Sequence, residues 1–199
     1  MLKKLIIILF CGFLTLSIQA QNFGGGIILG LSTSQVSGDH LGGFNKAGLL
    51  VGGFIDLQLS NMLRGQMEMT FIQKGSNNPK MNENSISDIS LSYVEVPLLL
   101  KYQQSSTIAI AGGIETAFLI SSSDNDIYGK ISSNNTREFN TTDIGIFIGL
   151  DYSISSRLIL NSRISNSILP IRAHASGATF QLNKGQYNSV LSFALHYIL

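Results

Sequence analysis

A histidine and a serine separated by one residue, His174 and Ser176, are the pair in this sequence whose types and spacing most directly suggest catalysis. A serine nucleophile needs a base within hydrogen-bonding distance and an acid that orients the base. Residues two apart on a strand share a face, so these two side chains could meet, and Asp143 would have to supply the acid from a neighbouring strand. A match of two residues often arises by chance, and an ordinary loop segment is the interpretation that we favour.

Nine charged side chains form a second group of candidate functional residues. Side chains alternate between the two faces of a strand, and each of these charges falls on the face opposite the apolar one. Acids and bases are similar in number, so we expect them to neutralise one another inside a barrel, because an unpaired buried charge is costly. A narrow polar conduit is the alternative. The nine residues are Arg64, Glu68, Glu95, Lys101, Glu115, Asp143, Asp151, Arg157 and Arg163.

Nothing else in the sequence indicates a cofactor or a metal ion. His40 and His196 are isolated, and the single cysteine, Cys11, lies in the apolar N-terminal run, so no metal-ligand spacing is present. The net charge of +1 gives no basic excess of the kind that nucleic-acid binding requires. We therefore expect no cofactor, no metal and no nucleic-acid partner.

The first twenty residues have the features of a cleaved secretory signal peptide. Lys3 and Lys4 precede an apolar run over residues 5–16, and Ala20 is suitable just before a cleavage site. A membrane anchor is the alternative, but the run is shorter than the roughly 20 apolar residues that a spanning helix needs. The expected organisation is a signal peptide over residues 1–20, read by the Sec pathway, and one domain over residues 21–199.

Eight candidate strands account for most of this domain. Each is at least as long as the roughly 9–11 residues that a tilted strand needs to cross a bilayer. Short connections alternate with long polar ones, which is typical of an up-and-down outer-membrane barrel with periplasmic turns and external loops. The expected strands cover residues 23–36, 46–59, 63–74, 89–102, 107–121, 141–152, 157–169 and 186–199.

The apolar faces of these strands must turn either to lipid or to a core. A water-soluble barrel or sandwich, such as a periplasmic ligand-binding barrel, would turn them inward, and alternation alone does not separate the two cases. Strand length does, because strands of soluble sandwiches are usually nearer 5–6 residues. We therefore predict an all-β fold, an eight-stranded antiparallel up-and-down transmembrane β-barrel surrounded by outer-membrane lipid.

The fourth strand carries two expected irregularities. Pro97 cannot donate a ladder hydrogen bond, which predicts a bulge or bend at that position. Ile89, Leu91 and Tyr93 are apolar yet have the alternation of the lumen, so a bulge near residue 92 is a further expectation.

The last strand is apolar at alternate positions up to the C-terminal residue. This ending resembles the insertion signal that the outer-membrane barrel assembly machinery reads, with leucine in place of the usual terminal phenylalanine. An ordinary closing strand is the alternative. The residues are Leu191, Phe193, Leu195, Tyr197 and Leu199.

Residues 93–102, with the sequence YVEVPLLLKY, resemble a motif of small outer-membrane β-barrel proteins of Bacteroidetes, the PorT-like family. The resemblance implies an outer-membrane barrel and, for some members, assistance to the type IX protein secretion system. It does not imply a particular molecular activity. We expect a structural or interaction role, with protein partners reached through the external loops. The alternatives are a small-solute channel and a lipid-acting hydrolase that uses His174 and Ser176.

Overall fold

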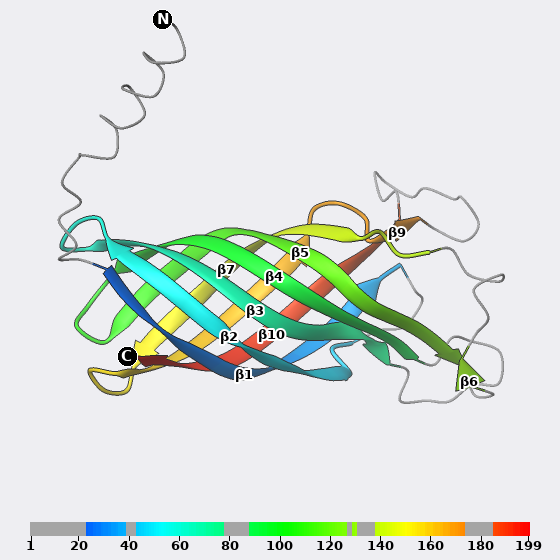
Figure 1. Ribbon diagram of the computed structural model, residues 1–199, viewed down its shortest axis with the longest axis horizontal. Helices are drawn as coiled ribbons and strands as arrows, with labels where there is room; N and C mark the ends of the chain where they lie inside the picture. The colour runs from blue at the N-terminus through cyan, green and yellow to red at the C-terminus, as the bar shows by residue number, and fades with distance from the viewer. Residues whose placement is uncertain (1–22, 39–42, 78–87, 127–128, 131–137, 174–184) are drawn as a thin grey trace, which may run out of the picture.

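Eight long antiparallel strands form one closed sheet in the computed structural model, which describes residues 23–38, 43–77, 88–126, 129–130, 138–173 and 185–199 (Figure 1). Each long strand pairs with its neighbour along the chain, and β1 pairs with β10 to close the barrel. The predicted eight-stranded all-β barrel is thus confirmed. The long strands are β1 (Phe23–Ser37), β2 (Lys46–Gln58), β3 (Leu63–Asn77), β4 (Asp88–Gln103), β5 (Ile108–Asp126), β7 (Thr142–Ser153), β8 (Leu158–Ser167) and β10 (Gly185–Ile198).

Two further strands have two residues each. β6 (Gly129–Lys130) pairs with the end of β5, and β9 (Arg172–Ala173) pairs with the start of β10. Among the residues that the structure describes, no helix is long and apolar enough to span a membrane.

The outward face of the barrel is apolar and the inward face carries the buried polar groups. Exposed hydrophobic residues occur at every second position of the strands, as in Ile27, Leu29 and Leu31 of β1, which are 53%, 59% and 65% exposed. The end of β10 has the same alternation: Phe193, Leu195, Tyr197 and Leu199 are exposed and Leu191 is half-buried. All five residues proposed as an insertion signal therefore share the outward face.

Three short turns at one end of the barrel share a hydrogen-bond pattern. A serine hydroxyl accepts the backbone N–H of the first residue of the following strand, from Leu63 to Ser60, from Ile108 to Ser105 and from Leu158 to Ser155, at 3.1–3.2 Å. The serines thus satisfy backbone donors that the turn would otherwise leave open. We call this end the turn end and the opposite one the loop end. β1 begins and β10 finishes at the turn end (Figure 1).

The expected bulge near residue 92 is present, but the extra residue belongs to β5. The register between β4 and β5 shifts at Ser92 and Tyr93, which leaves Ile120 of β5 without an opposite residue. Beyond Ile120 the alternation of β5 reverses, and Asp124 becomes buried.

No bulge forms at Pro97, although the ladder with β3 is interrupted over Val96 and Pro97. Pro97 lies opposite Glu115, and the register between β4 and β5 stays constant from Tyr93 to Gln103. The register with β3 is also the same on both sides of this position. Proline here removes one hydrogen-bond donor without adding a residue to the strand, so the ladder passes through unshifted.

Close approach of neighbouring backbones makes one luminal glycine of β5 sensitive to substitution. A Cβ atom on Gly113 would lie 2.8 Å from Leu99 Cα, with the Leu98 carbonyl oxygen closer still. On the adjacent Gly112 the nearest atom would be 3.7 Å away, an ordinary contact. We expect Gly113→Ala to lower the free energy of unfolding by about 1–3 kcal/mol, as overpacking does.

Urea titration of the refolded barrel would measure this difference, with Gly112→Ala as the matched control. Gly112→Ala should stay within about 0.5 kcal/mol of the parent protein. Equal effects of the two substitutions would contradict the role that we assign to the backbone contact at Gly113.

A charged and closed barrel lumen as the candidate functional site

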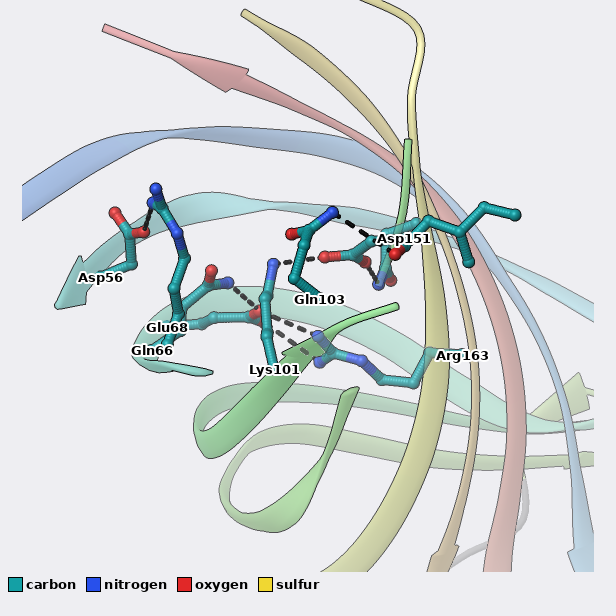
Figure 2. A network of polar contacts seen from close by, with 10 residues as sticks. Asp56, Gln66, Glu68, Lys101, Gln103, Asp151 and Arg163 are labelled. Atoms are coloured by element: carbon teal, nitrogen blue, oxygen red, sulfur yellow. Dashed lines mark hydrogen bonds and ion pairs between the residues drawn. The ribbon is translucent and has the colours of Figure 1, made fainter. Parts of the chain in front are cut away.

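Arg163 and Glu68 form a buried, two-pronged ion pair across the lumen. Arg163 extends from β8 and donates hydrogen bonds of 2.8 and 3.0 Å to the two carboxylate oxygens of Glu68 on β3 (Figure 2). Gln66 donates a third hydrogen bond to Glu68 at 2.7 Å. The guanidinium lies 4.2 Å from the ring centre of Phe147. Parallel hydrogen bonds of this kind are among the strongest between side chains, so they fix the two groups in one geometry.

Lys74 of β3 is surrounded by three carboxylates and is 1% exposed. It forms an ion pair with Glu95 of β4, and its ammonium lies 3.6 Å from Glu115 of β5 and 4.0 Å from Asp143 of β7. Asn188 of β10 donates a hydrogen bond of 2.9 Å to Asp143. One cation therefore connects four strands, and we call this group the Lys74 cluster.

Lys101 and Asp151 form a third buried pair, nearer to the turn end. The ammonium of Lys101 and the carboxylate of Asp151 are 2.5 Å apart, and Asn161 donates a hydrogen bond of the same length to the second oxygen of Asp151 (Figure 2). His196 of β10 is 1% exposed, and its ring lies 5.4 Å from that of Phe54. Polar groups from six strands thus fill the middle of the lumen.

One of the nine charges proposed for the interior lies elsewhere, and another lies at the mouth of the lumen. Arg157 is exposed in the turn before β8, which begins at Leu158, so its placement in the lumen was wrong. The alternation of a strand does not extend into the turn that precedes it. Arg64 lies at the open mouth of the turn end, where its side chain is 45% exposed and pairs with Asp56 at 2.5 Å. The other seven charges are brought together in the lumen.

Sequence reasoning missed a second set of charges at the loop end. Arg172 pairs with Asp124 at 2.6 Å and covers the ring of Phe139 at 4.0 Å. Lys46 pairs with Asp88 at 2.6 Å. The bulge at Ile120 hid the inward direction of Asp124, and Arg172 lies outside the long strands. No signal in the sequence could have joined these residues before the register was known.

A mainly apolar layer of buried side chains adjoins the Lys74 cluster on the side of the loop end, and we call it the apolar layer. Val36, Ile89, Tyr93 and Ile171 are all 0% exposed, and Leu91 is 1% exposed. Ile89, Leu91 and Tyr93, which are apolar although their alternation is that of the lumen, therefore belong to this layer. Side chains fill the cross-section here, as expected for a barrel of eight strands.

No cluster of three or more His, Cys, Asp or Glu in the described residues could hold a metal ion. His174 and Ser176 lie outside the described residues. Asp143, the acid considered for that pair, is 3% exposed and is engaged by Asn188 and the Lys74 cluster.

Comparison with known proteins agrees with this geometry. The family model described as "Outer membrane protein beta-barrel domain" matches residues 19–171. A comparison with curated protein sequences finds no match.

Two solved structures are similar to the chain in fold. One is Ail, the attachment invasion locus protein of Yersinia pestis, in complex with the heparin analogue sucrose octasulfate. It is 13% identical with a TM-score of 0.54, over 90% of this chain and 100% of Ail. The other is Neisserial surface protein A, 13% identical with a TM-score of 0.51, over 88% of this chain and 96% of that protein.

Proposed function

Because this chain belongs to the outer membrane protein beta-barrel domain family, we propose that it is a non-conducting outer-membrane scaffold that acts by contacting other molecules. Family membership and the fold place the protein in the outer membrane, which excludes the soluble alternative. The proposal concerns what the barrel does there. Its finer form, assistance to protein secretion, rests on the PorT-like resemblance of residues 93–102 alone.

One observation carries the proposal, namely that side chains close the lumen at two levels. The Arg163–Glu68 pair and the Lys74 cluster fill the middle, and the apolar layer lies beyond them. A solute would have to separate buried ion pairs and then displace the fully buried side chains packed beyond them. Both steps are costly, because separated buried charges lose their partners in a medium of low dielectric constant. A barrel closed in this way can act only through its two ends and its outer surface.

Conductance in planar lipid bilayers tests the closed lumen directly. We expect the purified, refolded barrel to insert without producing unitary current steps, whereas a porin of 16–18 strands in the same membranes produces them. Heat-modifiable gel mobility of the same sample would show that the inserted protein is folded. A reproducible unitary conductance of the folded barrel would favour the small-solute channel instead.

Contact with other molecules is tested by capture from outer-membrane fractions. The barrel with its long connections intact is compared with a variant in which residues 131–137 and 174–184 are replaced by short Gly-Ser segments. Partners that require the connections should be lost from the variant, while its gel mobility stays that of a folded barrel. Equal capture by both proteins would contradict an interaction role for the loops.

We further propose that the protein is not an enzyme. Asp143, the acid that a His174–Ser176 pair would require, is occupied by Asn188 and lies near Lys74 in the lumen. A lipid-hydrolysis assay in outer-membrane vesicles should give the same background for the parent protein and for Ser176→Ala. Hydrolysis that disappears with Ser176→Ala, while the barrel still inserts, would overturn this proposal.

A further inference from the structure

The lumen is filled in its middle, but at the turn end it contains an open hollow. The hollow has a volume of about 340 Å³, and its walls include Phe54, Asp56, Arg64, Gln103, Ile159 and Ile198. We call this hollow the turn-end vestibule. A second recess of about 360 Å³ shares Ser106, Ser153, Ile159 and Ile198 with it, so the hollow continues between two of the turns. Its volume lies at the lower end of the range for small-molecule sites.

Two cations meet in the vestibule from neighbouring strands. Arg64 of β3 lies directly opposite Lys101 of β4 in the ladder. Like charges in such a position repel each other, and here each is balanced by an aspartate on its far side, Asp56 for Arg64 and Asp151 for Lys101 (Figure 2). The four charges sum to zero, so the charge that a ligand would meet depends on which of them is exposed.

The accessible charge of the vestibule is almost entirely the guanidinium of Arg64. The side chains of Asp56, Lys101 and Asp151 are 9%, 8% and 4% exposed, whereas that of Arg64 is 45% exposed. Both oxygens of Asp151 already accept a hydrogen bond. In the part of the chain that the structure describes, Arg64 donates one hydrogen bond, to Asp56, although a guanidinium has five N–H groups. Its other N–H groups have no hydrogen-bond partner among the described residues, and the side chain lines the vestibule.

Apolar and polar walls surround this cation. Phe54, Ile159 and Ile198 provide an apolar surface, and the side-chain amides of Gln58 and Gln103 lie beside it. The amide nitrogen of Gln103 already donates to the Ser105 and Ile108 carbonyls, so it reports on the site without being needed as a donor. A ligand that matches both walls carries one negative charge and a short apolar part.

We propose that the turn-end vestibule binds a carboxylate attached to a short apolar group, with the carboxylate on Arg64 and the apolar part against Phe54, Ile159 and Ile198. The planar guanidinium fits a carboxylate with two parallel hydrogen bonds. Such a carboxylate is present both in a small free acid and at the C-terminus of a peptide. The site is independent of the external loops, so it extends beyond the scaffold function proposed above.

Nuclear magnetic resonance titrations of the labelled barrel in lipid nanodiscs would test the proposal. The ligands are hexanoate, the peptide N-acetyl-Ala-Leu with a free carboxylate, and the same peptide with an amidated C-terminus. We expect the carboxylate peptide to shift side-chain amide signals of Gln58 and Gln103 and the amidated peptide to bind about tenfold more weakly, as for a lost charge-assisted hydrogen bond. Binding of hexanoate as well would indicate that a free acid suffices, and binding of the peptide alone would indicate a polypeptide end.

Substitution of Arg64 separates this site from general attraction to a cationic surface. Arg64→Gln should weaken binding about tenfold. The double variant Asp56→Asn/Arg64→Gln should weaken it equally, and it avoids leaving the buried Asp56 carboxylate without a partner, which could destabilise the barrel. Arg157→Gln is the matched control, since Arg157 is exposed at the same end but does not line the vestibule. Its effect should be less than about twofold. Equal binding of the amidated peptide, equal effects of the Arg64 and Arg157 variants, or no shifts at Gln58 and Gln103 would each overturn the proposal.

Discussion

Replacing Lys74 by methionine is expected to lower the free energy of unfolding by about 3–5 kcal/mol, among the largest effects of a single substitution in this barrel. Methionine keeps most of the side-chain volume but removes the ammonium from the Lys74 cluster. Glu95, Glu115 and Asp143 would then face one another, each 3–4% exposed, without a cation between them. Like charges that share a buried site repel each other strongly, so the loss exceeds that of one hydrogen bond.

Urea titration of the barrel in lipid vesicles would measure this loss. The chain contains no tryptophan, so circular dichroism and the gel mobility of the folded form are suitable signals. Lys46→Met is the matched control, because the Lys46–Asp88 pair is 22% and 28% exposed. Removing such a pair should cost less than about 1 kcal/mol. If the two methionine variants lost the same stability, burial of the Lys74 cluster would not be what makes Lys74 important.

The sequence was sufficient to predict the wall of this barrel. In the strand expected over residues 141–152, Asp143 and Asp151 were assigned to the lumen and the apolar face to lipid. The structure buries both aspartates and exposes Ile146 and Ile148 on the opposite face. The reason is that a side-chain period of two is a local property of the chain, which each strand displays independently of its partners.

Strand boundaries and bulges were harder to predict, because both change the side of the sheet to which a residue points without changing the residue type. Arg157 has the alternation of a luminal residue but precedes the first residue of β8, and it therefore remains exposed. Asp124 has the alternation of an outward residue, but the extra residue Ile120 turns it inward. The position of a strand end or of a bulge is set by pairing with the neighbouring strand. The sequence of one strand alone therefore does not reveal it.

The pairing of charges across the lumen could not be predicted from the sequence. Glu68 and Arg163 are 95 residues apart and lie on β3 and β8, which are not neighbours in the sheet. Which luminal side chains meet depends on the stagger of the strands around the barrel. Composition showed only that acids and bases were similar in number. Their geometry, with one carboxylate for Arg163 and three for Lys74, is a property of the closed barrel.

The Arg163–Glu68 pair provides the second large effect and the sharpest test of how the lumen is held closed. Arg163→Met should destabilise the barrel by about 3–5 kcal/mol, because it leaves Glu68, 3% exposed, without its cation. Glu68→Met should also destabilise it, since Arg163 would lose both hydrogen bonds across the lumen.

The double variant Glu68→Met/Arg163→Met should recover most of the loss, because two apolar side chains of similar length can replace a buried ion pair at little cost. A double-mutant cycle of urea titrations gives the coupling energy of the pair, which we expect to be at least about 3 kcal/mol, the upper end for residues in direct contact. Additive losses in the double variant would show that each residue stabilises the barrel through separate contacts, such as Gln66 for Glu68 and Phe147 for Arg163. Recovery of stability without any gain of ion conductance would show that closure of the lumen depends on the volume of these side chains and not on their charge.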